Sequence, residues 1–395
     1  MSEIHYTHLS GKNITLAVTG GIAAYKCCEL VRLLVKSGAQ VRVCMTKAAC
    51  EFVGPLTFAA LSGRPVELDQ FSGSMQHLAL TRGCDLLIVA PATADIIGKA
   101  AGGIADDLVS TVIAAASCPT AFCPAMNCNM WAKPALQRNV AQLKADGAMI
   151  WGPAAGELAC GVSGAGRMFE PAQIAALAAR ALTPPVLAGR KVVVTAGPTY
   201  EALDPVRGIT NRSSGKQGYA LARAAFEAGA DVTLVSGPTS LTPPEGVTVV
   251  NVLSADEMNQ AVRREAETAD VFVSVAAVAD WKAAVVSGSK IKKSGSAPEL
   301  TLVENPDILS LTARDFPSLY CAGFAAETEN VLENARAKLE RKNARLIVAN
   351  NAREAIGSDS NEAWLVSAKG ETALGRLTKQ ALAERIVEAI AANLT

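Results

Sequence analysis

Short apolar strands alternate with amphipathic helices along most of this chain, and this alternation occurs twice. In the first half, strand-like runs cover residues 14–20, 40–46 and 85–93, with helical patterns between and after them. In the second half, the apolar run at 191–197 opens a comparable series. Buried strands that alternate with helices indicate parallel sheets covered on both faces. The sequence therefore predicts an α/β protein with two three-layer Rossmann-like domains, in which ligands bind at the carboxyl ends of the strands.

A stretch containing proline and glycine, LTPPVLAGRK at residues 182–191, separates the two series. This composition is typical of a linker. The chain has 395 residues, more than one ordinary hydrophobic core requires, so its length also favours two domains. We predict one domain at residues 1–185 and the other at residues 186–395.

The charge balance and hydropathy of the chain exclude some classes of partner. The formal net charge is zero, so no basic excess exists to neutralise the phosphates of a nucleic acid. The N-terminus lacks the apolar stretch of a signal peptide, and no run of about 18 apolar residues predicts a membrane span. We therefore expect a cytoplasmic protein without nucleic-acid or membrane partners, whose ten cysteines are thiols.

Three turns of the first half fall at strand ends, where a ligand would bind. Gly20 and Gly21 lie between a strand and a helix, where backbone N–H groups can bind a phosphate. The full G-x-G-x-x-G fingerprint is missing, so a tight structural turn is the alternative, and a nicotinamide-dependent reductase is disfavoured. Thr46 and Thr93 follow the next strands at the same edge of the sheet, which favours a mononucleotide over a dinucleotide.

Three further residues of the first half are candidates for chemistry. His77 is the only imidazole outside the N-terminal tail, and it is either a general base or a satisfied surface histidine. In CPAMNCNMW, the amide of Asn127 stands among Pro, Met, Cys and Trp, as in the lining of a ligand pocket. Cys160 lies in the glycine-rich GELACGVSGAGR, which indicates a mobile flap and a reactive thiol. The other cysteines lack the spacing of a zinc site.

Together, TGGIAAYK, PATAD, CPAMNCNMW and GELACGVSGAGR resemble the flavin-containing cysteine decarboxylases of the homo-oligomeric type. The resemblance implies a flavodoxin-like, flavin-binding domain in which His77, Asn127 and Cys160 are catalytic. Asn127 would bind the substrate carboxylate and Met126 would pack against the substrate. The implied FMN-binding residues are Gly20, Gly21, Ile22, Thr46, Pro91, Ala92, Thr93 and Asp95. Asp95 replaces the asparagine that is usual in this family.

The chemistry of such a decarboxylase requires an electron sink. Loss of CO₂ from a C-terminal cysteine amide leaves a carbanion, and oxidation of the CH₂–SH group to a thioaldehyde makes that carbanion accessible. The reduced flavin then reduces the resulting enethiol, with Cys160 as the proton donor.

Charged residues of the second half indicate binding of an anion. The loop from Gly208 to Gly215 is not a P-loop, yet it leads into a helix whose N-terminus can bind an anion. KIKK at residues 290–293 is a basic cluster, with a solvated loop as the alternative. Lys338 and Lys342 share one helix face, which suits a triphosphate. Without a histidine, this half would act by charge neutralisation and positioning.

The second half resembles the phosphopantothenate–cysteine ligases through DPVRGITNRSSGK, AAVADW, KIKK, ENPDIL, GFAAET and KLERKN. The resemblance implies CTP as co-substrate, an acyl-cytidylate intermediate and, with the triphosphate, Mg²⁺. Asn211 and Lys290 would be catalytic, and Arg207 and Asn211 would contact the substrate. The implied CTP-binding residues are Ala276, Asp280, Lys290, Asn305, Pro306, Asp307, Ile308, Phe324, Lys338 and Lys342. No metal ligands are assigned.

In this order, the two halves resemble the bifunctional coenzyme A biosynthesis proteins of bacteria. The resemblance implies that the second half ligates cysteine to 4′-phosphopantothenate, and that the first half decarboxylates the product to 4′-phosphopantetheine. It also implies a homo-oligomer, with trimers of the decarboxylase domain and dimers of the ligase domain building a dodecamer. The alternative is a regulatory subunit that binds a phosphatase. Cys160 on its flap and the complete ligase half disfavour that alternative.

Overall fold

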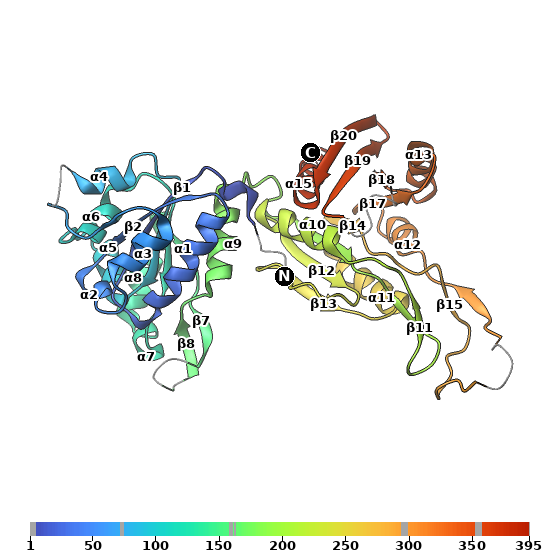
Figure 1. The fold of residues 1–395 in the computed structure, drawn as a ribbon, viewed down its shortest axis with the longest axis horizontal. Coiled ribbons are helices and arrows are strands. Elements are labelled where there is room, and N and C mark those ends of the chain that lie inside the picture. The colour runs from blue at the N-terminus through green and yellow to red at the C-terminus, as the bar shows by residue number, and fades with distance from the viewer. Residues whose placement is uncertain are drawn as a thin grey trace. The chain divides into compact units, whose positions relative to one another are not determined.

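The computed structural model describes residues 5–71, 75–157, 161, 163–293, 299–351 and 358–394. The chain divides into two compact units, residues 1–183 and 184–395 (Figure 1). This division falls inside the predicted linker at 182–191, and the domain boundary that we place after residue 185 lies close to it. Within the described ranges, no helix is long and apolar enough to span a membrane.

The first unit is built on a six-stranded parallel sheet with the strand order β3-β2-β1-β4-β5-β6. The strands are β1 (Asn13–Val18), β2 (Gln40–Met45), β3 (Val66–Glu67), β4 (Leu86–Ala92), β5 (Thr120–Pro124) and β6 (Met149–Ile150). The order reverses between β1 and β4, so the connections that leave these two strands run in opposite directions. This reversal opens a crevice at the carboxyl ends of the strands, where ligands of such sheets bind.

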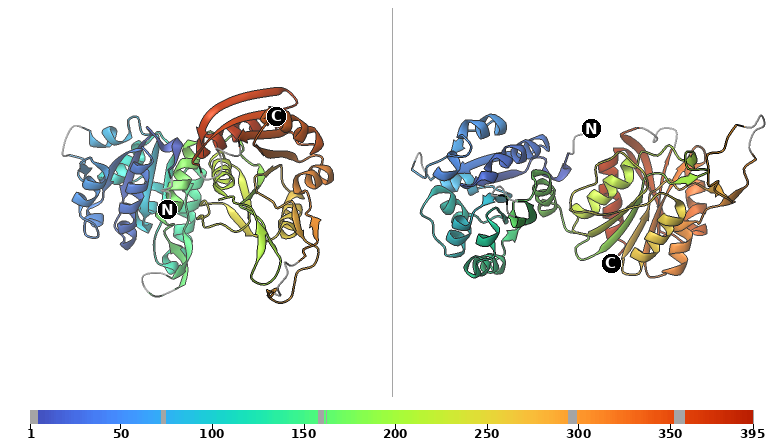
Figure 2. Two further views of the ribbon diagram at one scale, coloured as in Figure 1. Left: turned by 45° about the vertical axis from the view of Figure 1, so that its right-hand side comes forward. Right: turned by 90° about the horizontal axis from the view of Figure 1, so that it is seen from below.

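Helices cover both faces of this sheet (Figure 2). Helix α1 buries Leu30 and Leu34 on one face, and the core on the other face includes Val89 of β4 and Phe122 of β5. The helices are η1 (Thr7–Leu9), η2 (Ile22–Tyr25), α1 (Lys26–Lys36), α2 (Lys47–Cys50), α3 (Pro55–Ser62), α4 (Gln76–Thr81), α5 (Ala94–Ala101), α6 (Leu108–Ala115), α7 (Cys128–Trp131), α8 (Pro134–Ala145) and α9 (Pro171–Leu182). A hairpin of β7 (Ala154–Glu157) and β8 (Ser163–Arg167) precedes α9.

The second unit is built on an eight-stranded sheet with the order β13-β12-β9-β14-β17-β18-β19-β20. The strands are β9 (Lys191–Ala196), β12 (Asp231–Ser236), β13 (Thr248–Asn251), β14 (Val271–Ser274), β17 (Tyr320–Glu327), β18 (Leu346–Asn351), β19 (Ser360–Ser367) and β20 (Gly370–Thr378). The order reverses between β9 and β14, as it does between β1 and β4. Strands β19 and β20 are antiparallel, and the sequence analysis did not predict them. Because most side chains of β20 are exposed, that strand lacks an apolar pattern.

The helices of the second unit are α10 (Lys216–Glu227), α11 (Ala255–Ala266), α12 (Ile308–Asp315), α13 (Val331–Arg341) and α15 (Lys379–Ala391). Helix α11 begins with the predicted capping box, since the Ser254 hydroxyl accepts a hydrogen bond from the Glu257 N–H at 3.2 Å. Two hairpins extend away from the sheet (Figure 1). They are β10 (Tyr200–Ala202) with β11 (Gly208–Thr210), and β15 (Trp281–Ala283) with β16 (Leu302–Glu304).

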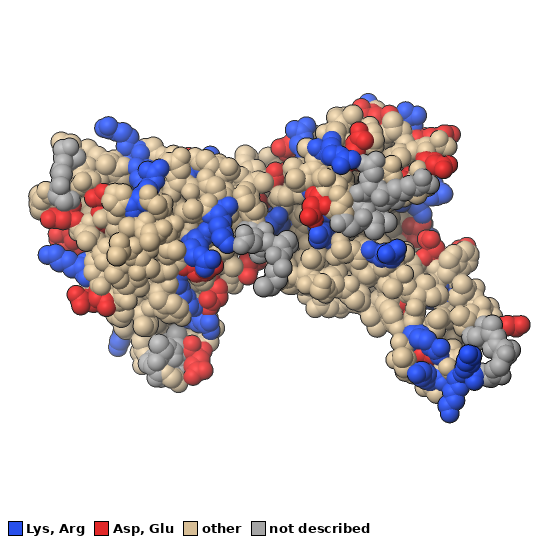
Figure 3. Space-filling view, viewed as in Figure 1, with Lys and Arg blue, Asp and Glu red and all other residues tan. Residues whose placement is uncertain are grey.

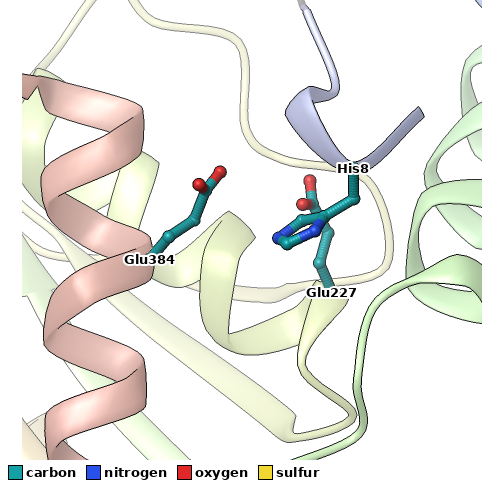
Figure 4. A group of neighbouring side chains, drawn as sticks. All are labelled: His8, Glu227 and Glu384. Carbon is teal, nitrogen blue, oxygen red and sulfur yellow. The ribbon is translucent and has the colours of Figure 1, made fainter. Parts of the chain in front are cut away.

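A pair of glutamates lies where α10 packs beside α15. Glu227 ends α10, and its carboxylate and that of Glu384 on α15 lie within 4.8 Å of each other (Figure 4). Neither carboxylate oxygen of the buried Glu227 accepts a hydrogen bond from a described residue. Burial raises the pKa of Glu227 to about 7, the charge of Arg223 opposes the rise, and that of Glu384 adds to it. Below that pH Glu227 is therefore protonated, and the two glutamates do not repel each other as like charges.

Candidate active sites

A cavity of about 1820 Å³ opens at the carboxyl edge of the first sheet. It brings together most of the residues predicted to bind the flavin and the substrate: Gly20, Gly21, Ile22, Thr46, Thr93, Asp95, Met126 and Asn127. The other two predicted flavin residues, Pro91 and Ala92, are buried at the end of β4, and the Pro91 carbonyl accepts a hydrogen bond from the Thr19 hydroxyl at 2.5 Å. Neither residue is among the described residues that line the cavity.

Three turns end their strands at this cavity and begin helices there. The turn after β1 is pressed against α2, since a Cβ atom on Gly20 would lie 2.4 Å from the Cβ atom of Ala48. Thr46 caps α2 by accepting the Ala49 N–H at 3.2 Å, and Thr93 caps α5 by accepting the Ile96 N–H at 3.4 Å. Helix starts favour negative groups, so this edge of the sheet suits a phosphate.

Asp95, the departure from the family pattern, lies in the first turn of α5 beside a cation. The ammonium of Lys99, one turn further along the helix, lies 3.5 Å from the Asp95 carboxylate. The same ammonium lies 3.0 Å from Asp106 and 3.6 Å from Asp107. The hydrogen bond to Asp106, together with the charges of these aspartates, raises the pKa of Lys99 against the effect of its burial. The negative charge that Asp95 brings to the cavity is therefore partly balanced within the chain.

The β7–β8 hairpin packs on the segment that carries Asn127. The Met126 N–H donates to the Gly166 carbonyl at 2.9 Å, and a Cβ atom on Gly166 would lie 2.2 Å from the Met126 carbonyl oxygen. Gly166 also has a φ of +152°, which side chains disfavour. Asn127 caps α7, since its side-chain oxygen accepts the Asn129 N–H at 2.8 Å. The hairpin therefore fixes the Asn127 segment from one side, while Cys160 itself lies outside the described residues.

A salt-bridge network at this cavity was not predicted from the sequence. The Lys26 ammonium lies 2.7 Å from a Glu170 carboxylate oxygen, and the Arg167 guanidinium lies 2.6 Å from the same oxygen. The hydrogen bond from Lys26 lowers the pKa of Glu170, with Arg167 adding to the effect against burial. Lys26 and Arg167 both line the cavity. The only signal for Lys26 in the sequence is its position as the last residue of the TGGIAAYK motif.

His77 lies on α4 and is half-buried. His77 is not among the described residues that line the cavity. Within one chain, the described structure therefore does not place it beside Asn127.

We expect Gly166→Ala to weaken the decarboxylation that the resemblance implies for the first half, without abolishing the fold. The added methyl group would collide with the Met126 carbonyl and force the hairpin away from Asn127, at a cost of about 1–3 kcal/mol. Release of CO₂ from a carboxyl-labelled substrate should decrease at least ten-fold. Gly147→Ala serves as control, because a left-handed glycine with open space around it has no such contact. Equal activity of the two variants would show that the close approach has no role.

The second unit has a cavity of about 730 Å³ at the carboxyl edge of its sheet. It is lined by Asn211 and by nine of the predicted CTP-binding residues: Ala276, Asp280, Asn305, Pro306, Asp307, Ile308, Phe324, Lys338 and Lys342. These residues come from five separate segments, which meet at the ends of the neighbouring strands β14 and β17.

Charged groups and amides are held in place around this cavity. Lys342 forms an ion pair with Asp307, which caps α12 by accepting the Ser310 N–H at 3.2 Å. Burial and the charge of Lys342 lower the pKa of Lys338. Asn305 donates to the Ala279 carbonyl at 2.8 Å, and Asn211 donates to the Ala277 carbonyl at 3.0 Å. Two cations and several oriented amides therefore face one space, as recognition of a nucleotide requires.

Arg207 and Lys290 are not among the described residues that line this cavity. They lie on the extension formed by the two hairpins, where basic side chains gather (Figure 3). Buried Asp204 joins their segments, since it accepts the Arg207 N–H at 2.8 Å, the Arg207 guanidinium at 2.6 Å and the Ile291 N–H at 3.1 Å. Although burial opposes it, these hydrogen bonds hold the pKa of Asp204 well below its usual range. The sequence gives no pattern that pairs Asp204 with Ile291.

Comparisons with known proteins cover both units. Residues 2–183 match the family described as Flavoprotein, and residues 187–394 match the C-terminal domain of the DNA/pantothenate metabolism flavoproteins. The chain is 48% identical over 390 residues to the coenzyme A biosynthesis bifunctional protein CoaBC of Vibrio parahaemolyticus, with 96% of this chain and 98% of the relative covered. It is 47% identical over 401 residues to that of Mycobacterium tuberculosis, with 96% of each covered.

The chain belongs to the family of coenzyme A biosynthesis bifunctional proteins. Membership confirms the resemblance, the Rossmann-like fold of both halves, and the assignment of the chain as a bifunctional decarboxylase and ligase of coenzyme A biosynthesis. Among solved structures, the C-terminal domain of a CoaBC protein is 40% identical, with a TM-score of 0.47, and covers 53% of this chain and 98% of its own length.

Proposed function

We propose that the second unit joins cysteine to 4′-phosphopantothenate with CTP, and that the first unit decarboxylates the product to 4′-phosphopantetheine. The observation that carries this proposal is the near-full-length identity to the bifunctional family, together with one cavity at the strand ends of each unit. A single assay tests it: CTP, Mg²⁺, 4′-phosphopantothenate and carboxyl-labelled cysteine should yield both CMP and labelled CO₂. Failure to form either product would overturn the proposal.

The proposed cofactor of the first unit is FMN, and the residues at the cavity fit it. A phosphate suits the helix starts after Gly21, Thr46 and Thr93, and all three residues line the cavity. The solved structure of a cysteine decarboxylase that is 36% identical over part of the chain is described as FMN-dependent. When bound, FMN supplies a hydride acceptor and donor. The match to the flavoprotein family supports the assignment.

In the first unit, the chain's own groups would bind the substrate and move protons. The Asn127 amide would hold the substrate carboxylate, with Met126 against its apolar part. His77 would act as the general base, and Cys160 would protonate the carbon at the end of the cycle. The β7–β8 hairpin would exclude water from this side of the cavity.

His77→Asn tests the first of these roles. We expect labelled CO₂ release to decrease by roughly 10²–10⁴-fold, because general-base catalysis contributes about that factor. CMP release should not change, since the ligase half is separate. The control is His5→Asn, which alters an exposed histidine and should preserve both products. Normal CO₂ release by the His77 variant would remove the proposed base.

In the second unit, the 4′-phosphopantothenate carboxylate would attack the α-phosphorus of CTP and release pyrophosphate. The amine of cysteine would then attack the acyl carbon of the acyl-cytidylate, and CMP would leave. Lys338 and Lys342 would neutralise the nucleotide phosphates, and Asn211 and Arg207 would hold the other substrate. The proposed Mg²⁺ would accompany the triphosphate, and carboxylates that line the cavity, such as Asp280 and Glu304, offer the oxygen ligands that it prefers.

Lys290→Gln should slow the first step of the ligase. We expect pyrophosphate release to fall roughly ten- to a hundred-fold, because the family resemblance implies a charged contact of Lys290 with the nucleotide, which the extension would have to bring to the cavity. Decarboxylation of supplied 4′-phosphopantothenoylcysteine should be unaffected. Lys369→Gln is the matched control, since Lys369 lies on the β19–β20 turn and bonds Asn393 at 2.8 Å. An unaltered rate for the Lys290 variant would refute its role.

We also propose that the chain works as a homo-oligomer, a dodecamer of trimers and dimers, in the cytoplasm. Exposed apolar side chains support association: Val206, Trp281 and Val285 on the extension, and Leu56 and Phe71 in the first unit. We expect the native mass to be about twelve times that of one chain, and Val285→Asp should reduce it. Light scattering of both proteins measures this, and a monomeric native mass would contradict the proposal.

The nine described cysteines are thiols, in agreement with the proposed compartment.

A further inference from the structure

Asp204 lies in the turn of the β10–β11 hairpin, and its side chain is fully buried. One carboxylate oxygen accepts the N–H groups of Val206 and Arg207, both at 2.8 Å. The other oxygen accepts Nε of Arg207 at 3.0 Å, Nη2 of Arg207 at 2.6 Å and the Ile291 N–H at 3.1 Å. A carboxylate with this many donors is fixed in one position, and it fixes the groups that donate to it.

The segment that follows β15 is attached to this turn at two points. The first point is Ser287, whose N–H donates to the Leu203 carbonyl at 3.0 Å. The second point is Ile291, whose N–H donates to Asp204 and whose carbonyl accepts the Arg207 guanidinium at 2.5 Å. Each end of this short segment is therefore held against the β10–β11 turn, and Asp204 is the side chain that holds the second end.

Lys290 is the only lysine between the two attachment points. The residues that precede it, Gly288 and Ser289, have the composition of a flexible chain, so they do not by themselves fix its direction. The Lys290 side chain is exposed, and the place of its ammonium group therefore depends on where the backbone is held. Holding the backbone before the substrates arrive reduces the conformational entropy that is lost on binding.

We propose that Asp204 is a positioning residue for Lys290 in the ligase reaction. The inference rests on the proposed ligase function, in which Lys290 takes part in forming the acyl-cytidylate. Because its side chain is buried, Asp204 does not contact a substrate itself. It acts by holding the Ile291 N–H, so that Lys290, the residue before Ile291, is presented in one arrangement. The ion pair with Arg207 balances the negative charge of Asp204 in this role.

Asp204→Asn tests the proposal with little change in side-chain volume. Both carboxylate oxygens accept hydrogen bonds, so the NH₂ group of an asparagine would face N–H donors in either orientation. The assay uses the full-length enzyme with CTP, Mg²⁺, 4′-phosphopantothenate and saturating cysteine. We expect kcat for pyrophosphate release to fall roughly ten- to a hundred-fold, as for Lys290→Gln. KM for 4′-phosphopantothenate should not change.

A double-mutant cycle separates positioning of Lys290 from a general loss of stability. When Asp204→Asn is added to the Lys290→Gln enzyme, kcat should change by no more than about two-fold, because the residue that Asp204 positions is already lost. Glu201→Gln is the matched control. Glu201 is a buried carboxylate of the same hairpin, but it accepts the Ala255 N–H at 2.9 Å at the start of α11. Its variant should release pyrophosphate at the normal rate.

Each other outcome of this cycle has a definite meaning. Losses that multiply in the double variant, or a normal kcat for Asp204→Asn, would overturn the proposal. A raised KM for 4′-phosphopantothenate with an unchanged kcat would also overturn it and assign the effect to Arg207. If Asp204→Asn does not fold, Ser287→Pro decides by the same criteria, because it removes the N–H of the other attachment point. The absence of pyrophosphate release by the unaltered enzyme would instead refute the ligase function on which the inference rests.

Discussion

The reversal of strand order within each parallel sheet determines where this protein can bind ligands. In the first unit the reversal lies between β1 and β4, and in the second between β9 and β14. Loops that leave neighbouring strands in opposite directions cannot cover the edge between them, so a crevice remains. Both cavities open there, and Asn127 and Asn211 each lie in a segment that lines one of them. Two different reactions therefore share one architectural solution.

Close backbone approaches give these crevices their final shape. A Cβ atom on Gly218 would lie 2.5 Å from the Cβ atom of Ala196, so α10 can start directly against the end of β9. Gly20 allows the corresponding approach to Ala48 in the first unit. Each glycine brings helix N–H groups to the cavity that a larger residue would hold away from it. The shape of both cavities thus depends on glycines, where a side chain is absent, as much as on the side chains that are present.

Local patterns made the central strands of both sheets and several of their covering helices predictable, because a buried parallel strand is apolar throughout and a covering helix is apolar on one face. The β19–β20 pair escaped prediction because β20 is mostly exposed. The sequence motifs identified segments that line both cavities, because those motifs lie directly after strands. Contacts between segments distant in the chain, such as Asp204 with Ile291 or Lys26 with Glu170, leave no sequence signal. They became visible only when the fold brought the segments together.

Two ion pairs at the second cavity, Lys342–Asp307 and Lys216–Asp359, differ in how firmly the carboxylate is held. Lys342 is paired with Asp307, whose carboxylate also caps α12 and is therefore fixed. Lys216 is paired with Asp359, whose side chain is largely exposed and can move away. A ligand at the first pair must add to an existing network, whereas a ligand at the second can replace a weak partner. The second pair is therefore the one at which an anionic ligand would displace fewer existing contacts.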